Sequence, residues 1–427
     1  MLKKLSFFGV VLVCSVFLLI LLISHRLVTS TSFEYSPLQS IGRTIQSWKS
    51  LEDVMDKSDP SNLYDDSFQA EILQTVANQR KKIEVEMIGY SYPDGKFNIS
   101  VSSLSDLVPE LGGNPMRSII VTTWRSGSTF LGDILNSHPA NYYHYEPLLD
   151  FSIIQIRGPP NAEKALNTLK NLLNCNYTNL DHYLDYGKGH VWLFNHNTRL
   201  WDQCLQHPTI CWFPEFLSPF CSLFPFQSMK IVRLRVRLIE KLLEDKRLNI
   251  RVLLLVRDPR GTLQSRKHRD WCPGQPDCDE PALLCADLVS DYSASIRLIS
   301  KYPDRFTVMR YEDLSLDPYG AAKQIFQFYG LDFHPKVVEF LDTHTKVNVG
   351  GVSSTYRDSK SAPFHWRQDL AFSEVRGIQD ACGPAMKYWG YVKAENASHQ
   401  LVFNPIVNFT IPCPEDVHRP YCVSTKS

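Results

Sequence analysis

The stretch SIIVTTWRSGSTF, residues 118–130, decides the fold of this chain. Its first part, residues 118–122, is a short apolar run typical of a buried strand, and a helical stretch is expected over residues 129–136. The loop between them leads into a helix N-terminus, where backbone N–H groups and the helix dipole favour a phosphate. The sequence therefore predicts an anion site at this loop.

Side chains of the loop suit such a site. Gly127 lets the backbone come close to a phosphate, and Arg125 supplies a planar cation. The alternative is a surface turn whose serines only cap a helix. The loop has no GxxxxGK[ST] motif and no lysine, which counts against a nucleoside triphosphatase. The residues predicted to bind the anion are Thr123, Trp124, Arg125, Ser126, Gly127, Ser128 and Thr129.

Strands and helices alternate along the rest of the chain. The candidate strands cover residues 230–234, 251–256 and 306–310, and the candidate helices cover 236–245, a stretch from 261 onward and 321–329. This alternation predicts an α/β fold with a P-loop-like, doubly wound parallel sheet flanked by helices. Ligands of such folds bind at the carboxyl ends of the strands.

The stretch LLLVRDPRGTLQSR, residues 253–266, predicts a second anion site. Arg257 lies at the exit of a strand, and Ser265 follows about two helical turns later on the same general side. We expect these two residues to bind a second phosphate, far from the first. The alternative is a structural ion pair between Arg257 and Asp258, which does not account for two anion sites on one sheet.

With both motifs in order, the chain resembles the galactose/N-acetylgalactosamine/N-acetylglucosamine 6-O-sulfotransferases, a family of carbohydrate sulfotransferases. The resemblance spans roughly residues 117–391. It rests on RSGSTFLGDILN, YEPL, KIVRLR, LLLVRDPRGTLQSR, VMRYEDL and the late HWR and GY segments. Residues 230–260 are similar to the chondroitin/keratan branch in particular.

The resemblance implies transfer of a sulfuryl group from 3′-phosphoadenosine 5′-phosphosulfate (PAPS) to a sugar 6-hydroxyl of a glycan or proteoglycan in the Golgi. It implies that residues 125–129 bind the 5′-phosphosulfate, and that Arg257 and Ser265 bind the 3′-phosphate. We expect no metal, because arginine and backbone donors can stabilise the developing charge.

Sulfuryl transfer requires a base for the acceptor hydroxyl and cations for the sulfonate. We predict Glu146 as the base, as a glutamate in a comparable place of related enzymes implies, and we expect partial burial to raise its pKa. The alternative is that Glu146 forms a structural ion pair with an arginine. His144 is the rival, because histidine accepts protons near neutral pH. Lys230 and Arg233, with Arg235, are expected to contact the sulfonate or an acidic acceptor, and the alternative is that they are solvated edge charges.

Other residues are expected around the site. Glu312 is predicted to orient a phosphate-site arginine. The resemblance implies that a late loop with Arg357, Trp366 and Arg367 closes over the nucleotide. Residues 149–221 and 271–281 are expected to contact the acceptor, and the cysteine-containing insert 271–285 to shape the mouth of the site.

The N-terminus predicts a single-pass membrane anchor. Residues 5–24 carry no charge, and about 20 apolar residues span a bilayer. A cleaved signal peptide is the alternative, but the run is long and lacks an A-x-A-like site. The positive-inside tendency places residues 1–4 in the cytosol and the body in the lumen. A stem over residues 25–111 and a catalytic domain over residues 112–427 are expected to follow.

Sequons and cysteines fit a luminal body. Ten of the 11 cysteines lie outside the anchor, which favours disulfides of unknown pairing, and zinc at Cys272, Cys278 and Cys285 is the weaker alternative. Lys plus Arg and Asp plus Glu number 45 each, which counts against nucleic acid as a partner. The predicted glycosylation sites are Asn98, Asn176, Asn396 and Asn408.

Two other functions are considered. The missing Walker lysine and the Arg257–Ser265 pair count against a membrane-tethered nucleotide kinase or hydrolase. Two intact phosphate motifs count against a catalytically inactive PAPS- or glycan-binding scaffold. The sequence identifies neither the acceptor sugar nor the glycan, and it leaves the oligomeric state open, with a homodimer as one option.

Overall fold

The computed structural model describes residues 66–96, 99–350, 354–415 and 421–424. The chain divides into residues 1–60 and a compact unit of residues 61–427, and only the second is described below. The predicted anchor lies outside the described residues. Among the residues that are described, no helix combines the length and apolar character needed to cross a membrane.

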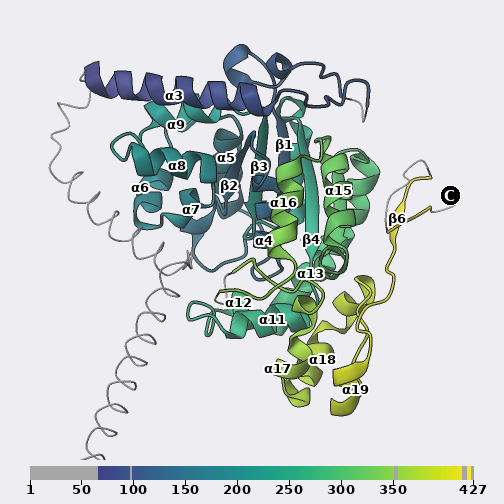
Figure 1. Ribbon diagram of the computed structural model, residues 1–427. Coiled ribbons are helices and arrows are strands. Elements are labelled where there is room, and N and C mark those ends of the chain that lie inside the picture. The colour runs from purple at the N-terminus through teal and green to yellow at the C-terminus, as the bar shows by residue number, and fades with distance from the viewer. Residues whose placement is uncertain (1–65, 97–98, 351–353, 416–420, 425–427) are drawn as a thin grey trace, which may run out of the picture. The chain divides into compact units, whose positions relative to one another are not determined.

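A five-stranded sheet forms the centre of the unit (Figure 1). Its order is β2-β3-β1-β4-β5, and each neighbouring pair is parallel. The parallel α/β sheet flanked by helices is therefore confirmed. The strands are β1 (Met116–Val121), β2 (Asn141–Tyr145), β3 (Phe226–Ile231), β4 (Ile250–Val256) and β5 (Phe306–Arg310).

Helices cover both faces of the sheet (Figure 1). On one face α4, α15 and α16 enclose an apolar core that includes Ile120, Leu253 and Phe326. On the other face α10 and α13 pack against β4 and β5. With helices on both faces, strands such as β4 are buried along their whole length, which explains the continuous apolar run IRVLLLV.

The described helices have the following bounds. They are α3 (Asp66–Glu86), α4 (Ser128–Asn136), α5 (Asn161–Leu173), α6 (Asp181–Gly189), α7 (Trp192–Asn195), α8 (Thr198–Gln206), α9 (Pro214–Cys221), α10 (Val236–Glu244), α11 (Pro259–Lys267), α12 (Pro276–Asp279), α13 (Pro281–Lys301), α14 (Tyr311–Leu316), α15 (Pro318–Tyr329), α16 (Pro335–His344), α17 (Trp366–Asp369), α18 (Phe372–Tyr388) and α19 (Ala397–Val402).

Helix α3 packs on the body, along α9 (Figure 1). It buries Ile72, Val76 and Ile83. At its surface, Arg80 Nη2 lies 2.6 Å from Glu110 Oε1. The stem was expected to run to residue 111, but residues from 66 onward belong to the same compact unit as the sheet. The difference arises because the apolar residues of α3 are few and widely spaced, so its buried face gave a weak signal.

Ten cysteines form five disulfides in the described residues. They are Cys175–Cys221, Cys204–Cys211, Cys272–Cys278, Cys285–Cys382 and Cys413–Cys422. Disulfides are thus confirmed, and zinc binding by the three cysteines of the insert is wrong. The last bond joins two short parallel strands, β6 (Ile411–Cys413) and β7 (Cys422–Ser424).

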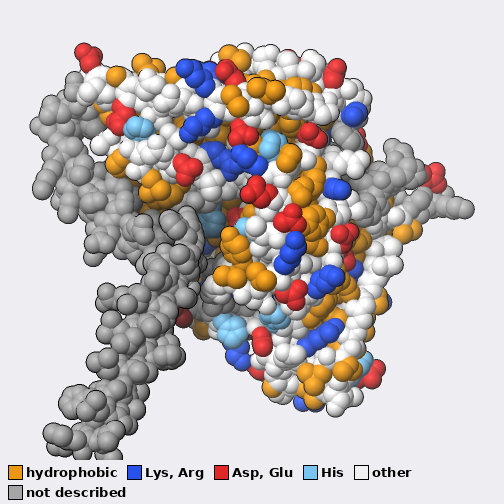
Figure 2. All heavy atoms as spheres, in the orientation of Figure 1, with side chains coloured by type: hydrophobic (Ala, Val, Ile, Leu, Met, Phe, Trp, Pro, Cys, Tyr) orange, Lys and Arg blue, Asp and Glu red, His pale blue; other side chains and the backbone are white. Residues whose placement is uncertain are grey.

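Charges are mixed on the face drawn in Figure 2. Lys and Arg side chains are interspersed there with Asp and Glu side chains, and no broad field of a single sign covers it. This agrees with the formal net charge of zero. A strongly basic binding site must therefore be local.

Candidate active site

The loop between β1 and α4 has an unusual backbone. Arg125 has φ 64° and Gly127 has φ 84°. A Cβ on Gly127 would lie 2.1 Å from Cδ2 of Tyr311, so both the backbone angle and the packing require glycine there. Gly127 is the N-cap of α4, and the helix begins at Ser128. The predicted anion loop therefore stands at a helix N-terminus, as expected.

The residues of the two predicted anion sites are in contact. Arg125 Nε donates to Ser265 Oγ at 3.0 Å, and Arg257 Nη1 donates to the carbonyl O of Arg125 at 2.8 Å. The expectation that the second site lies far from the first is therefore wrong. The reason is that β1 and β4 are neighbouring strands, and the Arg125 side chain reaches from one loop to the helix that follows the other.

Arg257 is nearly buried, and its contacts differ from those of a structural ion pair. Its guanidinium lies 4.7 Å from the centre of the Tyr311 ring. Asp258 binds Arg260 instead, at 2.7 Å, so the predicted alternative of an Arg257–Asp258 pair is wrong. Within the described residues, Arg257 Nε is buried without a hydrogen-bond partner. A buried cation of this kind suits an anionic ligand.

Glu146 follows β2 and binds two cations. Lys230 Nζ lies 2.9 Å from Oε1, and Arg233 Nη1 lies 2.9 Å from Oε2. The side chains of the two cations are only 1% and 2% exposed, so the alternative of solvated edge charges is wrong. Lys230 Nζ also donates to Thr129 Oγ1 at 3.2 Å, which places this group beside the anion loop.

The electrostatics of Glu146 overturn one expectation. Burial acts to raise the pKa of Glu146, but the charges and hydrogen bonds of Lys230 and Arg233 outweigh burial and lower this pKa to about 2. The prediction of a raised pKa is therefore wrong for the protein without ligand. Glu146 also has φ 40°, a strained value for a residue with a side chain.

His144 lies away from this cluster. It points to the face of β2 that carries Tyr142, whose ring centroid lies 5.1 Å away, while the alternating Tyr145 faces Lys230. Burial lowers the pKa of His144 to about 3. A buried, neutral histidine on the opposite face is a core residue and not a competing base.

The sequence reasoning missed Tyr145 and Arg266. The ring of Tyr145 lies 3.8 Å below Lys230 Nζ and stacks on His196. Arg266, beside Ser265, donates to the carbonyl O of Trp124 at 3.1 Å and to Thr123 Oγ1 at 2.6 Å. These two hydrogen bonds hold the anion loop against α11. The sequence gives no separate signal for Arg266, because it points to another face of the helix than its neighbour Ser265.

Arg266 also reaches the insert that was expected to shape the acceptor mouth. Its Nη1 donates to the carbonyl O of Cys278 at 2.7 Å. Trp124 packs in a small core with Cys272 and Cys278. The loop closed by this disulfide therefore braces the anion loop, and its expected shaping of the acceptor mouth stays a prediction. Burial, with the nearby charge of Arg235, lowers the pKa of Arg266 to about 9.

The structure corrects two other predictions. Arg235 forms a buried ion pair with Asp291 and lies away from Glu146 in the hydrogen-bond network. Glu312 does not hydrogen-bond to a phosphate-site arginine. Its Oε1 accepts from the backbone N–H of Asp258 at 3.0 Å, and its Oε2 accepts from Tyr391 OH at 3.0 Å. Glu312 thus fixes the backbone next to Arg257.

The late loop lies against α11. The carbonyl O of Pro363 would lie 3.3 Å from a Cβ on Gly261. Trp366 is fully buried under Arg260, and Arg367 stacks on Phe364 at 4.8 Å. Closure of this loop over a nucleotide stays a prediction.

Three of the predicted sequons are exposed in the structure, and one is outside the described residues. Asn176, Asn396 and Asn408 lie at the surface, and Asn98 is not described. Among the described residues, no group of three or more His, Cys, Asp or Glu side chains is arranged to hold a metal ion.

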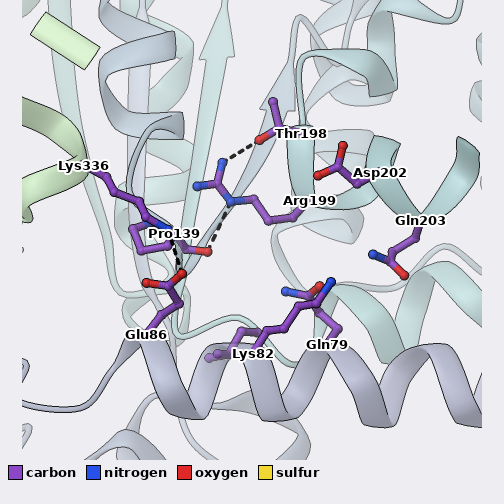
Figure 3. Close-up of a pocket in the computed structure, with 10 residues that line it drawn as sticks. Gln79, Lys82, Glu86, Pro139, Thr198, Arg199, Asp202, Gln203 and Lys336 are labelled. Carbon is purple, nitrogen blue, oxygen red and sulfur yellow. Dashed lines mark hydrogen bonds and ion pairs between the residues drawn. The ribbon is translucent and has the colours of Figure 1, made fainter. Parts of the chain in front are cut away.

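A pocket of about 280 Å³ lies elsewhere, between α3, α8 and α16 (Figure 3). Arg199 reaches across it and donates to the carbonyl O atoms of Asn136 at 2.6 Å and Pro139 at 3.2 Å. The carbonyl of Asn136 lies at the end of α4 and that of Pro139 lies in the turn after it. The anion loop lies at the opposite end of α4, where the helix starts. The pocket contains none of the predicted site residues and is separate from the candidate active site.

The comparisons with known proteins agree with this geometry. A family model described as "Sulfotransferase domain" matches residues 115–390, more than half of the chain. Carbohydrate sulfotransferase 5 of Mus musculus is 26% identical over 324 residues, covering 65% of this chain and 81% of that protein. Carbohydrate sulfotransferase 3 of Homo sapiens is 25% identical over 335 residues, covering 68% of this chain and 70% of that protein.

Solved structures give a weaker match. The sulfotransferase domain from the Synechococcus PCC 7002 olefin synthase is 19% identical and covers 64% of this chain and 94% of that one, with a TM-score of 0.35. A score of this size adds nothing to the argument. The family match and the relatives are sufficient: the chain is an enzyme of the sulfotransferase family and is similar to its carbohydrate sulfotransferases.

Proposed function

We propose that this sulfotransferase transfers the sulfuryl group of PAPS to the 6-hydroxyl of galactose, N-acetylgalactosamine or N-acetylglucosamine in a glycan or proteoglycan chain. One observation carries the proposal. Arg125, Arg257 and Ser265 meet beside the N-terminus of α4, and the Glu146 cluster reaches the same loop through Thr129. The groups assigned to the donor and a carboxylate thus lie at the same end of the sheet, where the strands have their carboxyl ends.

The residues present fit a donor with phosphates at both ends. The N-terminus of α4 and the backbone at Gly127 suit the phosphosulfate. Arg257 has a buried Nε without a partner in the described part of the chain, and a 3′-phosphate would supply both an acceptor and a negative charge. The Arg125–Ser265 hydrogen bond would open to admit the donor, because both groups are assigned to it.

Glu146 is proposed to take the proton of the acceptor hydroxyl. The acceptor oxygen then bonds to sulfur while the bond from sulfur to the 5′-phosphate oxygen breaks, and the nucleotide leaves as its 3′,5′-bisphosphate. A pKa of about 2 makes Glu146 a weak base as long as both cations hold it. A sulfonate beside Thr129 attracts Lys230 and Arg233, which weakens their hold on Glu146 and raises its pKa.

The cellular setting is part of the proposal. We place the chain in the Golgi membrane as a single-pass protein with a luminal catalytic domain. The support is the uncharged run of residues 5–24, the sequons and the disulfide-bonded cysteines. Glycosylation at Asn98, Asn176, Asn396 and Asn408 belongs to the same proposal.

The test incubates the full-length chain with radiolabelled PAPS and a panel of desulfated glycans. Nuclear magnetic resonance of the product then identifies the sulfated carbon. We expect transfer to a 6-hydroxyl. PAPS binding without transfer to any acceptor would favour the inactive scaffold, and transfer of phosphate from ATP would favour the kinase.

Replacing Glu146 tests the assignment of the base. We expect Glu146→Gln to lower kcat by about 10²- to 10⁴-fold, because glutamine cannot accept the proton of the acceptor hydroxyl. The dissociation constant for the nucleotide 3′,5′-bisphosphate should change little. His144→Gln is the control and should keep most of the activity.

Folding must be checked in the same experiment, because Glu146→Gln leaves two buried cations without a carboxylate. Thermal unfolding of each variant shows whether the fold persists, and Glu146→Asp keeps the charge if the glutamine variant does not fold. Near-normal turnover by folded Glu146→Gln would show that another residue is the base.

A further inference from the structure

Aromatic side chains lie on α6 and at the start of α7. Helix α7 packs against the edge strand β2 (Figure 1). The rings of Tyr186 and His190 stack with centroids 3.8 Å apart and planes 1° apart. Trp192 meets His190 edge to face at 5.0 Å, and 43% of Trp192 is exposed. His190 Nδ1 lies 2.9 Å from the carbonyl O of Tyr186, which fixes the stack on the helix.

Three polar contacts and two short stretches of chain connect these rings to the Glu146 cluster. Arg233, which binds Glu146, also donates from Nε to the carbonyl O of Ser152 at 2.7 Å. Two residues before Ser152, the carboxylate of Asp150 lies 2.9 Å from Nε2 of His182 in α6. The face of α6 that carries His182 is therefore turned toward the active site.

Helical spacing places the aromatic side chains on this same face. Tyr186 is four residues after His182 in α6, so these two lie on one face of the helix. His190 follows the end of α6 at Gly189, and its stacking on Tyr186 places it next to this face. The charge of Arg233 reaches Tyr186 as well: burial raises the pKa of Tyr186, and Arg233 opposes this rise. The row therefore starts at the catalytic cations and leads outward to Trp192.

Such a row matches a sugar chain better than a compact small molecule. A pyranose has an apolar C–H face that packs on an aromatic ring and a rim of hydroxyls that hydrogen-bond to polar groups. Aromatic rings with polar edges provide both kinds of contact at low entropic cost. A row of rings that leads outward from the reaction centre can hold several linked sugars.

We propose that Tyr186, His190 and Trp192 form a platform for the acceptor sugars that neighbour the one being sulfated. This inference rests on the proposed function, since it assigns the acceptor-chain side of that same site. It makes an extended glycan the preferred acceptor and a single sugar a poor one. None of the three residues contacts the donor-binding groups in the described structure, so donor binding is independent of the platform.

The experiment compares acceptors of two lengths with the full-length chain. For Tyr186→Ala and Trp192→Ala we expect KM for a desulfated hexasaccharide to rise by about tenfold, whereas KM for the matching monosaccharide glycoside stays the same. The Kd for the nucleotide 3′,5′-bisphosphate should also be unchanged. Trp192→Phe should restore most of the hexasaccharide affinity.

A matched control separates a specific effect from a general one. Tyr388 in α18 is 41% exposed and stacks on Tyr292, away from α6, so Tyr388→Ala should leave KM for both acceptors unchanged. Unchanged hexasaccharide KM in the platform variants, with an active wild type, would overturn the platform alone. A wild type that sulfates no acceptor would overturn the proposed function and the platform with it.

Discussion

Glu312 is buried beneath the Arg257 loop and carries a carboxylate without a hydrogen-bonded cation among the described residues. Burial and the neighbouring charge of Asp258 raise its pKa to about 7. The backbone N–H of Asp258 and the hydroxyl of Tyr391 hold its two oxygens. The protonation of this one group is therefore linked to the stability of the segment that carries Arg257.

The sign of the linkage gives a prediction for Glu312. A raised pKa means that the folded protein binds the proton more tightly than the unfolded chain. The resulting stability is full below about pH 4.5 and is lost as the pH rises through about 7. The free energy of unfolding should therefore fall by up to about 3 kcal/mol over this window in the wild type. The contribution should be absent in Glu312→Gln.

Denaturant unfolding at a series of pH values measures this difference. Glu163→Gln, an exposed position in α5, is the control and should keep the wild-type pH profile. Parallel profiles for wild type and Glu312→Gln would mean that Glu312 does not carry the proton.

At the residue scale, Arg125, Gly127, Arg257 and Ser265 lie in the strand-to-helix connections where their motifs place them. The two predicted anion sites are in contact, however, and not far apart as expected. The pKa of Glu146 was predicted with the wrong sign, because burial was considered without the two cations that share the site. Their approach to Glu146 depends on the pairing of β2 with β3, which a single sequence does not show.

Among the elements, the short loop closed by Cys272 and Cys278 has the clearest structural role. Arg266 bonds to its carbonyl at Cys278 on one side and to the anion loop at Trp124 on the other. On the far side of this short loop, Asp277 accepts from the backbone N–H of Gln155 at 2.6 Å. The loop thus joins the anion loop to the segment after β2.

We expect the double variant Cys272→Ser/Cys278→Ser to raise KM for PAPS by about tenfold, or about 1.4 kcal/mol, because the brace behind the anion loop loosens. The change in kcat should be smaller. Initial rates at varied PAPS and saturating acceptor measure both. The control is Cys204→Ser/Cys211→Ser, since that bond closes a loop of similar length near α8 and should leave KM for PAPS unchanged. Equal effects of the two double variants would refute the brace.

At the scale of elements, the strand with the longest aliphatic run was predicted, and the strand without an aliphatic residue was missed. The strand β4 was evident from its apolar run, whereas β2 (NYYHY) has no aliphatic residue and was not identified as a strand. Its strand character comes from pairing with β3 and from aromatic packing, which are tertiary effects. The helices α6 and α7 were likewise part of a stretch without an interpretable motif.

At the scale of the whole molecule, the sequence assigned the residues of α3 to the stem, whereas the structure places them with the sheet. It belongs to the unit of residues 61–427, and its buried apolar side chains pack on the catalytic body. The parallel sheet, in contrast, was predicted correctly, because the alternation of strands and helices repeats over the whole domain and tolerates one missed strand.

Truncation tests the role of α3. A chain that starts at Ser61 should keep the thermal stability of the compact unit. A chain that starts at Met87 lacks α3 and loses the burial of Ile72, Val76 and Ile83, so we expect its Tm to be lower by roughly 5–10 °C. Circular dichroism during heating measures both. Equal Tm values would show that α3 is an appendage and not part of the body.

The strand order has a consequence for how such enzymes diversify. The groups proposed to bind the donor follow β1 and β4, whereas Glu146 and the segment leading to α6 follow β2, at the edge of the sheet. Substitutions around the edge strand can therefore change which sugar is modified while the proposed donor-binding residues stay the same. Enzymes with this strand order can therefore acquire new acceptors without any change in the residues that handle the donor.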